Sequence, residues 1–343
     1  MLVSELKKTL GKYKKEELIL IITEMYKSIP KKLREEKDID SLLEDAPNYI
    51  RIGKGAKAKD MQINMDDLKQ EIDRFIDHAY KQYYFAPNNV IHKKDRPKWR
   101  FKVKNYIKTL QNIAVDGDEG SIATGLLAKL YEMLCYACGY YLFNTEAPFR
   151  SVGIEQEALL DTVIERRLSY GINQENVKSA IELVTKSIEN PNTVNSSLIY
   201  VLVKNLKTAD AKEMAIEQCK LLLNKWKESK KTSTKKSWSA DRSDYELGEK
   251  NNLLAEMVFR INIALCEFDE AIQSFKKYYA SYNAEVNLYV LLEMLWEYEL
   301  KDLWMREYEE ALKKGLKPRE NLRNIYKFIQ ENNCLPESFY IYS

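Results

Sequence analysis

The chain has 343 residues, enough for one large domain or two ordinary ones, and 31% of them are charged. The net charge of +2 is too small to indicate a polyanionic partner by itself. Five scattered cysteines, an odd number, argue against a disulfide framework, and the N-terminal residues lack the pattern of a secretory signal. We therefore expect a cytoplasmic protein with reduced thiols and no membrane association.

Helical periodicity accounts for most of the first 170 residues. Glycine and proline are scarce, with 11 and 8 copies, and this favours long helices over sheets, whose turns need both residues. Apolar spacing predicts helices, in chain order, over 4–28 with a break near Gly11, over 64–85, after Pro97, over 119–143 and over 154–168. The side chains expected to face inward from the helix after Pro97 are Phe101, Ile107, Leu110 and Ile113.

Residues 119–143 form the most apolar long segment of the chain. Leu126, Leu130 and Met133 follow one helical stripe, and neighbouring apolar and aromatic residues cover most of the remaining surface. Because a helix that is apolar on most sides is buried on most sides, we expect other helices to surround it. Lys129 and Glu132 near its middle argue against a membrane-spanning helix.

Three segments of this part carry a resemblance to a known kind of domain. They are LKKTLGKYKKEELILIITEMY near the N-terminus, YKQYYFAPN at the end of the next long helix, and RPKWRFKVKNYIK after it. Together they resemble an uncharacterised bacterial all-helical domain family. The resemblance implies a helical domain over residues 1–170, and it brings no activity and no catalytic residues.

Residues 171–343 predict a second region, made of helical hairpins. Apolar periodicity favours helices over 173–189, 196–206 and 209–227, and the polar, basic stretch 227–244 then predicts a loop or hinge. Beyond it, the sequence FDEAI from Phe268 recurs as YEEAL from Tyr308, 40 positions later. This pattern resembles tetratricopeptide-type repeats, although its period exceeds that family's length of about 34 residues. We predict an all-α fold, in which an N-terminal helical domain precedes helical-hairpin repeats stacked as a TPR- or HEAT-like solenoid.

Two short motifs resemble parts of redox or metal sites. Cys135 and Cys138 form a CxxC pair, but zinc needs two further ligands, and the pair lies within a predicted helix. Packing of both thiols as small apolar groups is therefore the favoured interpretation. The acidic turn at 116–120 lacks the glycine and glutamate spacing of an EF-hand, and its acids favour the start of the next helix instead.

Three carboxylates, Glu157, Asp161 and Glu165, are spaced four positions apart and share one helix face. Such a row binds metal when another helix supplies Glu or His, but the chain has only two histidines, His78 and His92, and no ExxH motif. A solvated face is favoured, and we predict no metal site and no cofactor. A metal-dependent enzyme that uses Glu157, Asp161 or His78 is the second alternative function.

The stretch 92–108, HKKDRPKWRFKVKNYIK, combines eight basic residues with one acid, Asp95. Basic groups neutralise phosphates, and aromatic rings such as Trp99, Phe101 and Tyr106 stack on bases. The nucleic-acid hypothesis assigns a site to Lys93, Lys94, Arg96, Lys98, Trp99, Arg100, Lys102 and Lys104. The competing interpretation is an amphipathic helix whose aromatic side chains face the core and whose lysines are solvated.

The leading hypothesis is a non-enzymatic interaction or scaffold protein. The sequence contains no phosphate-binding glycine loop and no hydrolase motif, so an enzyme is less favoured than a binding protein. Stacked hairpins form an extended concave surface that suits a protein or peptide partner, with nucleic acid as the alternative partner. Aromatic residues are enriched at interface hot spots, and the candidates here are Tyr278, Tyr279, Tyr282, Tyr289 and Trp296.

Overall fold

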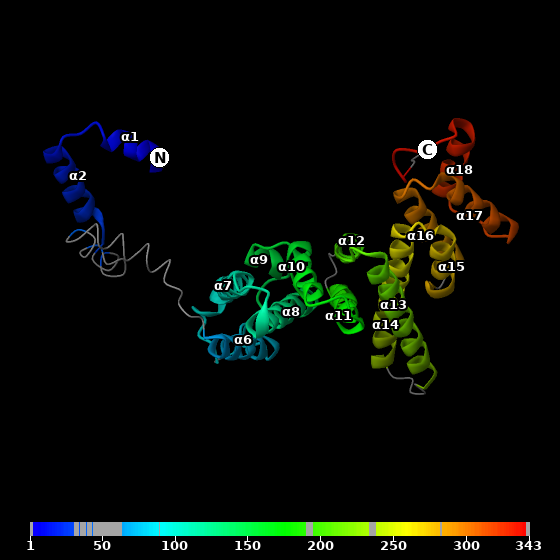
Figure 1. Ribbon diagram of the computed structural model, residues 1–343, viewed down its shortest axis with the longest axis horizontal. Helices are drawn as coiled ribbons and strands as arrows, with labels where there is room; N and C mark the ends of the chain where they lie inside the picture. Colours follow the sequence, from blue (N-terminus) through cyan, green and yellow to red (C-terminus); the bar gives the residue numbers. More distant parts are fainter. Residues whose placement is uncertain are drawn as a thin grey trace. The chain divides into compact units, whose positions relative to one another are not determined.

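The structure, a computed structural model, describes residues 3–30, 34, 39, 43, 64–88, 90–189, 195–232, 238–281 and 283–340. Every regular element in these residues is a helix, which confirms the all-α prediction (Figure 1). The chain divides at residue 64 into two compact units, residues 1–64 and residues 65–343.

The first unit contains the described helices α1 (Val3–Leu10) and α2 (Lys15–Ser28). The chain leaves the helical conformation at Gly11, as predicted, and the Lys14 backbone N–H donates a 2.7 Å hydrogen bond to the Glu17 carboxylate at the start of α2. No side chain of α2 is buried; Ile19 is 54% exposed and Leu20 is 66% exposed. Apolar spacing therefore predicts this helix correctly but does not predict burial.

The second unit is built around α8 (Gly117–Gly139), as the sequence predicts for its most apolar segment. Leu127, Leu130 and Leu134 on successive turns of α8 are fully buried. The elements that contact α8 are α6 (Met65–Tyr80), α7 (Trp99–Gln111), α9 (Pro148–Val152), α10 (Gln156–Ser169) and the 3-10 turn η2 (Lys186–Glu189). A 3-10 turn, η1 (Arg96–Lys98), leads into α7.

Two of these helices end earlier than predicted. α6 stops at Tyr80, and the chain then turns because Gln82 adopts a left-handed backbone with φ of 59°. α8 stops at Gly139 because Tyr140 is extended. Leu142 and Phe143, which follow α8, are still buried, Phe143 completely, but they are buried from a loop, and Tyr141 between the helix and these residues is exposed. Apolar periodicity therefore continues past the true end of the helix.

Four further helices follow, α11 (Gln174–Thr185), α12 (Asn195–Asn205), α13 (Ala209–Thr232) and α14 (Trp238–Ala264). α10 contacts α12, α11 contacts α13, and α13 pairs with α14 along its length (Figure 1). The loop or hinge predicted over 227–244 is corrected, because α13 and α14 extend through its described part, and residues 233–237 lie outside the described residues. Lysine, alanine and arginine, which this stretch contains, are good helix formers, so a stretch without apolar periodicity can still be helical.

The C-terminal helices are α15 (Phe268–Tyr278), α16 (Ala284–Glu297), α17 (Lys301–Lys313) and α18 (Glu320–Asn332). Turns of the same geometry join α14 to α15 and α16 to α17. Cys266 and Glu299, 33 positions apart, both have a left-handed backbone, and each donates a 2.9 Å hydrogen bond to the carbonyl three residues before it. The predicted 40-residue alignment is therefore wrong, because FDEAI opens α15 whereas YEEAL lies in the second half of α17.

Buried residues of the second unit form two hydrophobic cores. The first core extends from Met65 to Tyr278 around α8, and the domain boundary predicted at residue 170 lies inside it. The second core extends from Phe259 to Phe339, and α14 contributes to both. None of the described helices combines the length and the apolar character needed to cross a bilayer.

Candidate functional site

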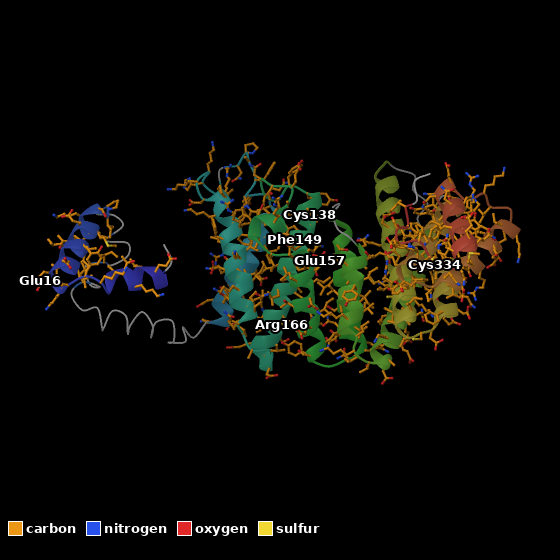
Figure 2. The ribbon with its side chains drawn as sticks, turned by 90° about the horizontal axis from the view of Figure 1, so that it is seen from above. Glu16, Cys138, Phe149, Glu157, Arg166 and Cys334 are labelled. Atoms are coloured by element: carbon orange, nitrogen blue, oxygen red, sulfur yellow. The ribbon has the colours of Figure 1, made fainter. Side chains whose placement is uncertain are left out.

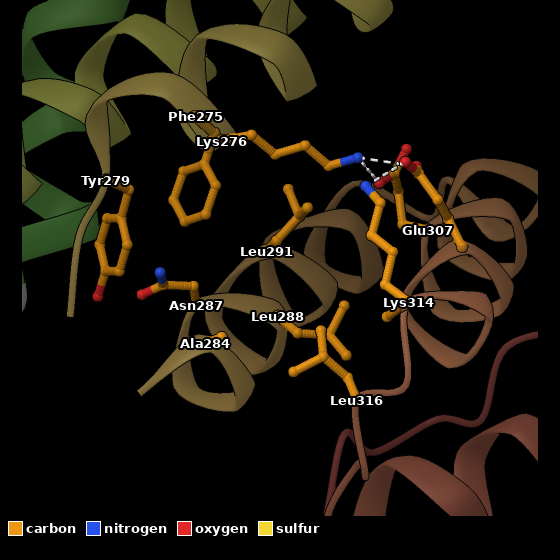
Figure 3. A pocket seen from close by; sticks show the side chains of 12 residues that line it. Phe275, Lys276, Tyr279, Ala284, Asn287, Leu288, Leu291, Glu307, Lys314 and Leu316 are labelled. Atoms are coloured by element: carbon orange, nitrogen blue, oxygen red, sulfur yellow. Dashed lines mark hydrogen bonds and ion pairs between the residues drawn. The ribbon is translucent and has the colours of Figure 1, made fainter. Parts of the chain in front are cut away.

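A cleft of about 250 Å³ opens between the end of α15, the start of α16 and the end of α17 (Figure 3). Phe275, Leu288 and Leu291 form its apolar floor, and Ala284 and Leu316 lie at its edge. Pockets for small-molecule ligands usually exceed about 300 Å³, so this volume suits a single large side chain better than a cofactor.

One wall of the cleft is a network of ion pairs between α15 and α17. Lys276 contacts both Glu307 and Glu310, the latter at 2.9 Å, and Lys314 contacts Glu310 at 2.5 Å. The Glu307 side chain is only 3% exposed and also accepts a 3.3 Å hydrogen bond from Arg306. Hydrogen bonds from Lys314 and Lys276 lower the pKa of Glu310 to about 2. Both acids of this wall therefore have cationic partners at neutral pH.

Two further lysines are next in sequence to residues that line the cleft. Lys313 and Lys317 flank the lining residues, are exposed, and form no ion pair with any described residue. The nearby acid Glu285 is already paired with Arg319 at 2.6 Å. Exposed cations that are not already paired are available to a ligand with acidic groups.

The aromatic residues predicted as partner anchors are separated by the structure. Tyr278 is 6% exposed and belongs to the first core, whereas Tyr279 lines the cleft with its ring stacked on Phe275 at 4.5 Å (Figure 3). Burial raises the pKa of Tyr279 to about 12, so its hydroxyl is protonated at neutral pH. Tyr282 lies outside the described residues.

Tyr289 and Trp296 lie on α16 next to the C-terminal segment 333–340. Phe339 of that segment is 2% exposed and contacts both rings, with centroid distances of 5.2 Å and 5.7 Å. The Trp296 indole N–H donates a 2.9 Å hydrogen bond to the Pro336 carbonyl. The chain itself thus occupies the surface around these two candidates, and among the described candidates Tyr279 lies in an open cleft.

The charged wall was not identified from the sequence. Lys276 and Glu307 lie on two helices, so no local spacing relates them. The pair of Glu310 and Lys314, four positions apart on α17, was a local signal that sequence reasoning missed.

The basic stretch 92–108 has a buried aromatic side and an exposed cationic side. Trp99 is 5% exposed, and Tyr106 is 6% exposed and donates a 2.7 Å hydrogen bond to Glu71. Phe101, which was expected to face inward, is 62% exposed, because the buried stripe of α7 passes through Trp99, Val103 and Tyr106 instead. Two of the three aromatic residues are therefore unable to stack on bases.

Most of the predicted phosphate-binding side chains are exposed, namely Lys93, Lys94, Lys98, Arg100, Lys102 and Lys104. Lys98 forms a 2.8 Å ion pair with Asp95. Arg96 is half-buried and holds the preceding loop, because its guanidinium donates to the carbonyls of Asn88 and Ile91, the latter at 2.9 Å. The cations of this stretch are thus mostly exposed, but they do not all line one cavity, and Arg96 has a structural role as well.

The metal and redox candidates do not assemble into a centre. Asp161 accepts hydrogen bonds from Lys204 at 2.9 Å and from Asn205 at 2.7 Å, which tie α10 to α12. Across the part of the chain that the structure describes, no three His, Cys, Asp or Glu residues are grouped as metal ligands. Cys135 is buried in α8, and burial raises the pKa of Cys138 to about 12, so its thiol is protonated.

The acidic turn before α8 is held by a buried arginine. Arg166 on α10, which Figure 2 labels, is 7% exposed and donates a 3.0 Å hydrogen bond to the Ile113 carbonyl. The Tyr170 hydroxyl donates a 2.8 Å hydrogen bond to the Val115 carbonyl. Gly120 lies so close to this segment that a Cβ atom would overlap the Val115 carbonyl oxygen. These contacts give the turn a structural role at the start of α8.

Comparisons with protein-family models, curated proteins and solved structures found no significant match to this chain. The two resemblances derived from sequence segments therefore stay predictions.

Proposed function

We propose that the protein is a non-enzymatic interaction protein that binds a segment of a protein partner in the cleft between α15, α16 and α17. The apolar floor of this cleft, beside a charged wall, is the observation that supports the proposal most directly. A desolvated apolar pocket surrounded by polar groups is the usual make-up of an interface hot spot. Tyr279 adds an aromatic ring at the edge of the floor.

The proposed ligand is a peptide segment with one large apolar side chain flanked by acidic residues. The cleft of about 250 Å³ has room for one such side chain against Leu288 and Leu291. Lys313 and Lys317, exposed and next in sequence to residues that line the cleft, are the cations proposed to meet carboxylates next to that anchor. The protonated Tyr279 hydroxyl supplies a hydrogen-bond donor.

Filling the cleft tests the proposal. Ala284 is exposed at the cleft edge, so Ala284→Trp blocks the entrance without removing a buried contact. Ala158 is also exposed on a helix but lies outside the cleft, so Ala158→Trp is the matched control. The full chain and both variants are immobilised and used to capture proteins from a native lysate.

A protein captured by the parent chain and by Ala158→Trp, but not by Ala284→Trp, supports the proposal. A synthetic acidic peptide from that protein, centred on a large apolar residue, should then compete for binding. Equal capture by all three chains, or capture of no protein, contradicts it. Thermal unfolding of each variant verifies that the fold is intact.

Nucleic-acid binding by residues 92–108 is the second candidate function. Two observations favour it: the exposed cations of α7, and the exposed Phe101 ring, over which the Arg100 guanidinium lies at 4.9 Å. Affinity for single-stranded RNA or DNA should fall steeply with salt, because each neutralised phosphate releases condensed counterions. An anisotropy titration at low salt that detects no binding at micromolar protein contradicts this candidate.

A further inference from the structure

A second cavity, of about 480 Å³, lies between the start of α7, the loop after α8 and α9. Its base is apolar and fixed in place by aromatic packing. The Trp99 ring stacks on Phe143 with centroids 3.8 Å apart and planes at 11°, and Tyr84 packs against Phe75 at 5.0 Å. A base held in this way needs little reorganisation when a ligand binds.

The charged side chains that line this cavity are all cationic: Lys93, Arg96 and Arg100. Arg96 is oriented before any ligand arrives, because its Nε donates a 2.9 Å hydrogen bond to the Ile91 carbonyl. Lys93 and Arg100 are exposed, and the Arg100 guanidinium, which lies over the exposed Phe101 ring, is held among the described residues only by that surface contact. Three cations around one cavity favour the binding of an anion.

The opposite wall supplies neutral hydrogen-bonding groups. Thr145 and Ser151 line the cavity together with Asn144, and their hydroxyl oxygens lie 3.1 Å apart. Ser151 also bonds to the Ala147 carbonyl at 3.0 Å, which fixes this wall. Hydroxyl and amide groups complement charged ones in the recognition of phosphate oxygens.

No acidic residue is among the described residues that line this cavity. The Asp95 carboxylate is paired with Lys98 at 2.8 Å, and Glu71 accepts the hydrogen bond from Tyr106. Glu146 is exposed and lines a neighbouring cavity of about 330 Å³ rather than this one. The lining residues therefore carry a net positive charge.

We propose that this cavity binds a small organic phosphate, such as a nucleotide. The cations and hydroxyls recognise the phosphate, since arginine and lysine are the usual partners of phosphate oxygens. The apolar base formed in part by Trp99 and Tyr84 contacts the organic body, and the volume lies within the usual range for small-molecule sites. The same chemistry is offered by a free nucleotide and by the phosphorylated end of a nucleic-acid strand.

This proposal does not depend on the C-terminal cleft. The two sites share no residue, so a variant of one is a control for the other. It also differs from general nucleic-acid binding along α7, because it assigns the phosphate to one cavity rather than to the whole basic surface.

The test is calorimetric titration of the full chain with AMP, adenosine and inorganic phosphate. The variant Lys93→Gln/Arg100→Gln removes two cations from the cavity, and both residues are exposed, so the fold should be unaffected. The matched control, Lys104→Gln/Lys108→Gln, removes two exposed cations of α7 that do not line the cavity. We expect AMP to bind and adenosine not to bind. The cavity variant should weaken AMP binding about tenfold or more, and the control less than about threefold.

Oligonucleotides of one sequence, with a 5′-phosphate or a 5′-hydroxyl, distinguish the two sources of phosphate. Tighter binding of the 5′-phosphorylated strand, lost in the cavity variant, supports the proposal and identifies a strand end as the source. Binding of AMP without tighter binding of the 5′-phosphorylated strand also supports the proposal and identifies a free nucleotide as the source of the phosphate. If both double variants weaken binding equally, or if no phosphate-bearing probe binds at millimolar concentration, the proposal is overturned.

Discussion

The two hydrophobic cores of the second unit are built in different ways. In the first core, one helix, α8, is covered on most sides, and Leu127, Leu130 and Leu134 are completely buried. In the second core, a helix such as α17 buries a single stripe, so Tyr308 is 2% exposed while Leu312 is 43% exposed. A helix covered by several neighbours joins them into one cooperative structure, whereas stacked hairpins contact mainly their neighbours and add stability piece by piece.

The largest expected effect comes from a substitution that should destabilise the second core and leave the first core protected. Trp304 on α17 is fully buried and its ring stacks on Tyr308 at 5.3 Å, so Trp304→Ala should lower the free energy of unfolding by about 3–5 kcal/mol. Hydrogen exchange should show the loss of protection mainly in α15–α18, with α8 still protected. Loss of protection in α8 to the same extent would show that the cores unfold as one.

A conservative variant sharpens that measurement. Among the described residues the Trp304 indole nitrogen has no hydrogen-bond acceptor, and an unsatisfied buried donor carries a cost. Trp304→Phe should therefore retain much more stability than Trp304→Ala.

In the first core, replacing either of two glycines of α8 by alanine should change stability in opposite directions. Gly120→Ala should destabilise by about 1–3 kcal/mol, because the added methyl group meets the Val115 carbonyl oxygen. Gly125→Ala should stabilise by about 0.5–1 kcal/mol, because open space surrounds that position and alanine favours helix. Urea denaturation of both variants makes the comparison, and equal effects would contradict the close packing at Gly120.

Glu256 on α14, the helix shared by both cores, should link stability to pH. Burial raises the pKa of Glu256 to about 7, partly opposed by Arg260. The folded state therefore binds this proton more tightly than the unfolded state, whose ordinary pKa is near 4.5. Stability should fall as pH rises between these values and then level off, and Glu256→Gln should gain about 1–2 kcal/mol at pH 8. Unfolding curves at pH 4, 6 and 8 test this, and a parallel pH dependence in the variant would rule it out.

The smallest expected effect concerns the charged wall of the cleft. Glu310 has a pKa lowered to about 2, so its contribution to stability is present above its ordinary pKa near 4.5 and is lost as pH falls towards 2. Its side chain is 42% exposed, and exposed ion pairs contribute less than about 1 kcal/mol. Glu310→Gln should therefore change stability slightly at pH 7 and not at pH 2, as measured by thermal unfolding. A larger loss of stability would mean that these ion pairs hold α15 and α17 together.

Much of this fold could be predicted from the sequence, and the exceptions share a physical origin. Apolar spacing indicated most of the helices, because a buried stripe is a local property of one helix. The helix end near Gln82 was missed, because this residue adopts a left-handed backbone without being glycine. Phe101 was placed inward because several apolar residues in one helix permit more than one stripe.

The candidate site was less predictable than the fold. Tyr279 was identified because it is aromatic, and the structure places it in the cleft. Lys276 and Glu307 meet across two helices, and the cationic cavity joins Arg100 to Ser151, about fifty positions further along the chain. Such contacts depend on how helices pack, which the local pattern of residues does not specify.

The segment 333–340 can cover the aromatic residues of α16 only late in the synthesis of the chain. Trp296 and Tyr289 are made well before Phe339, yet it is Phe339 that packs against them. On the ribosome these aromatic rings are therefore uncovered until nearly all of the described chain has been translated. A ribosome that stalls before Phe339 would present an exposed aromatic patch, and such patches attract chaperones and promote aggregation.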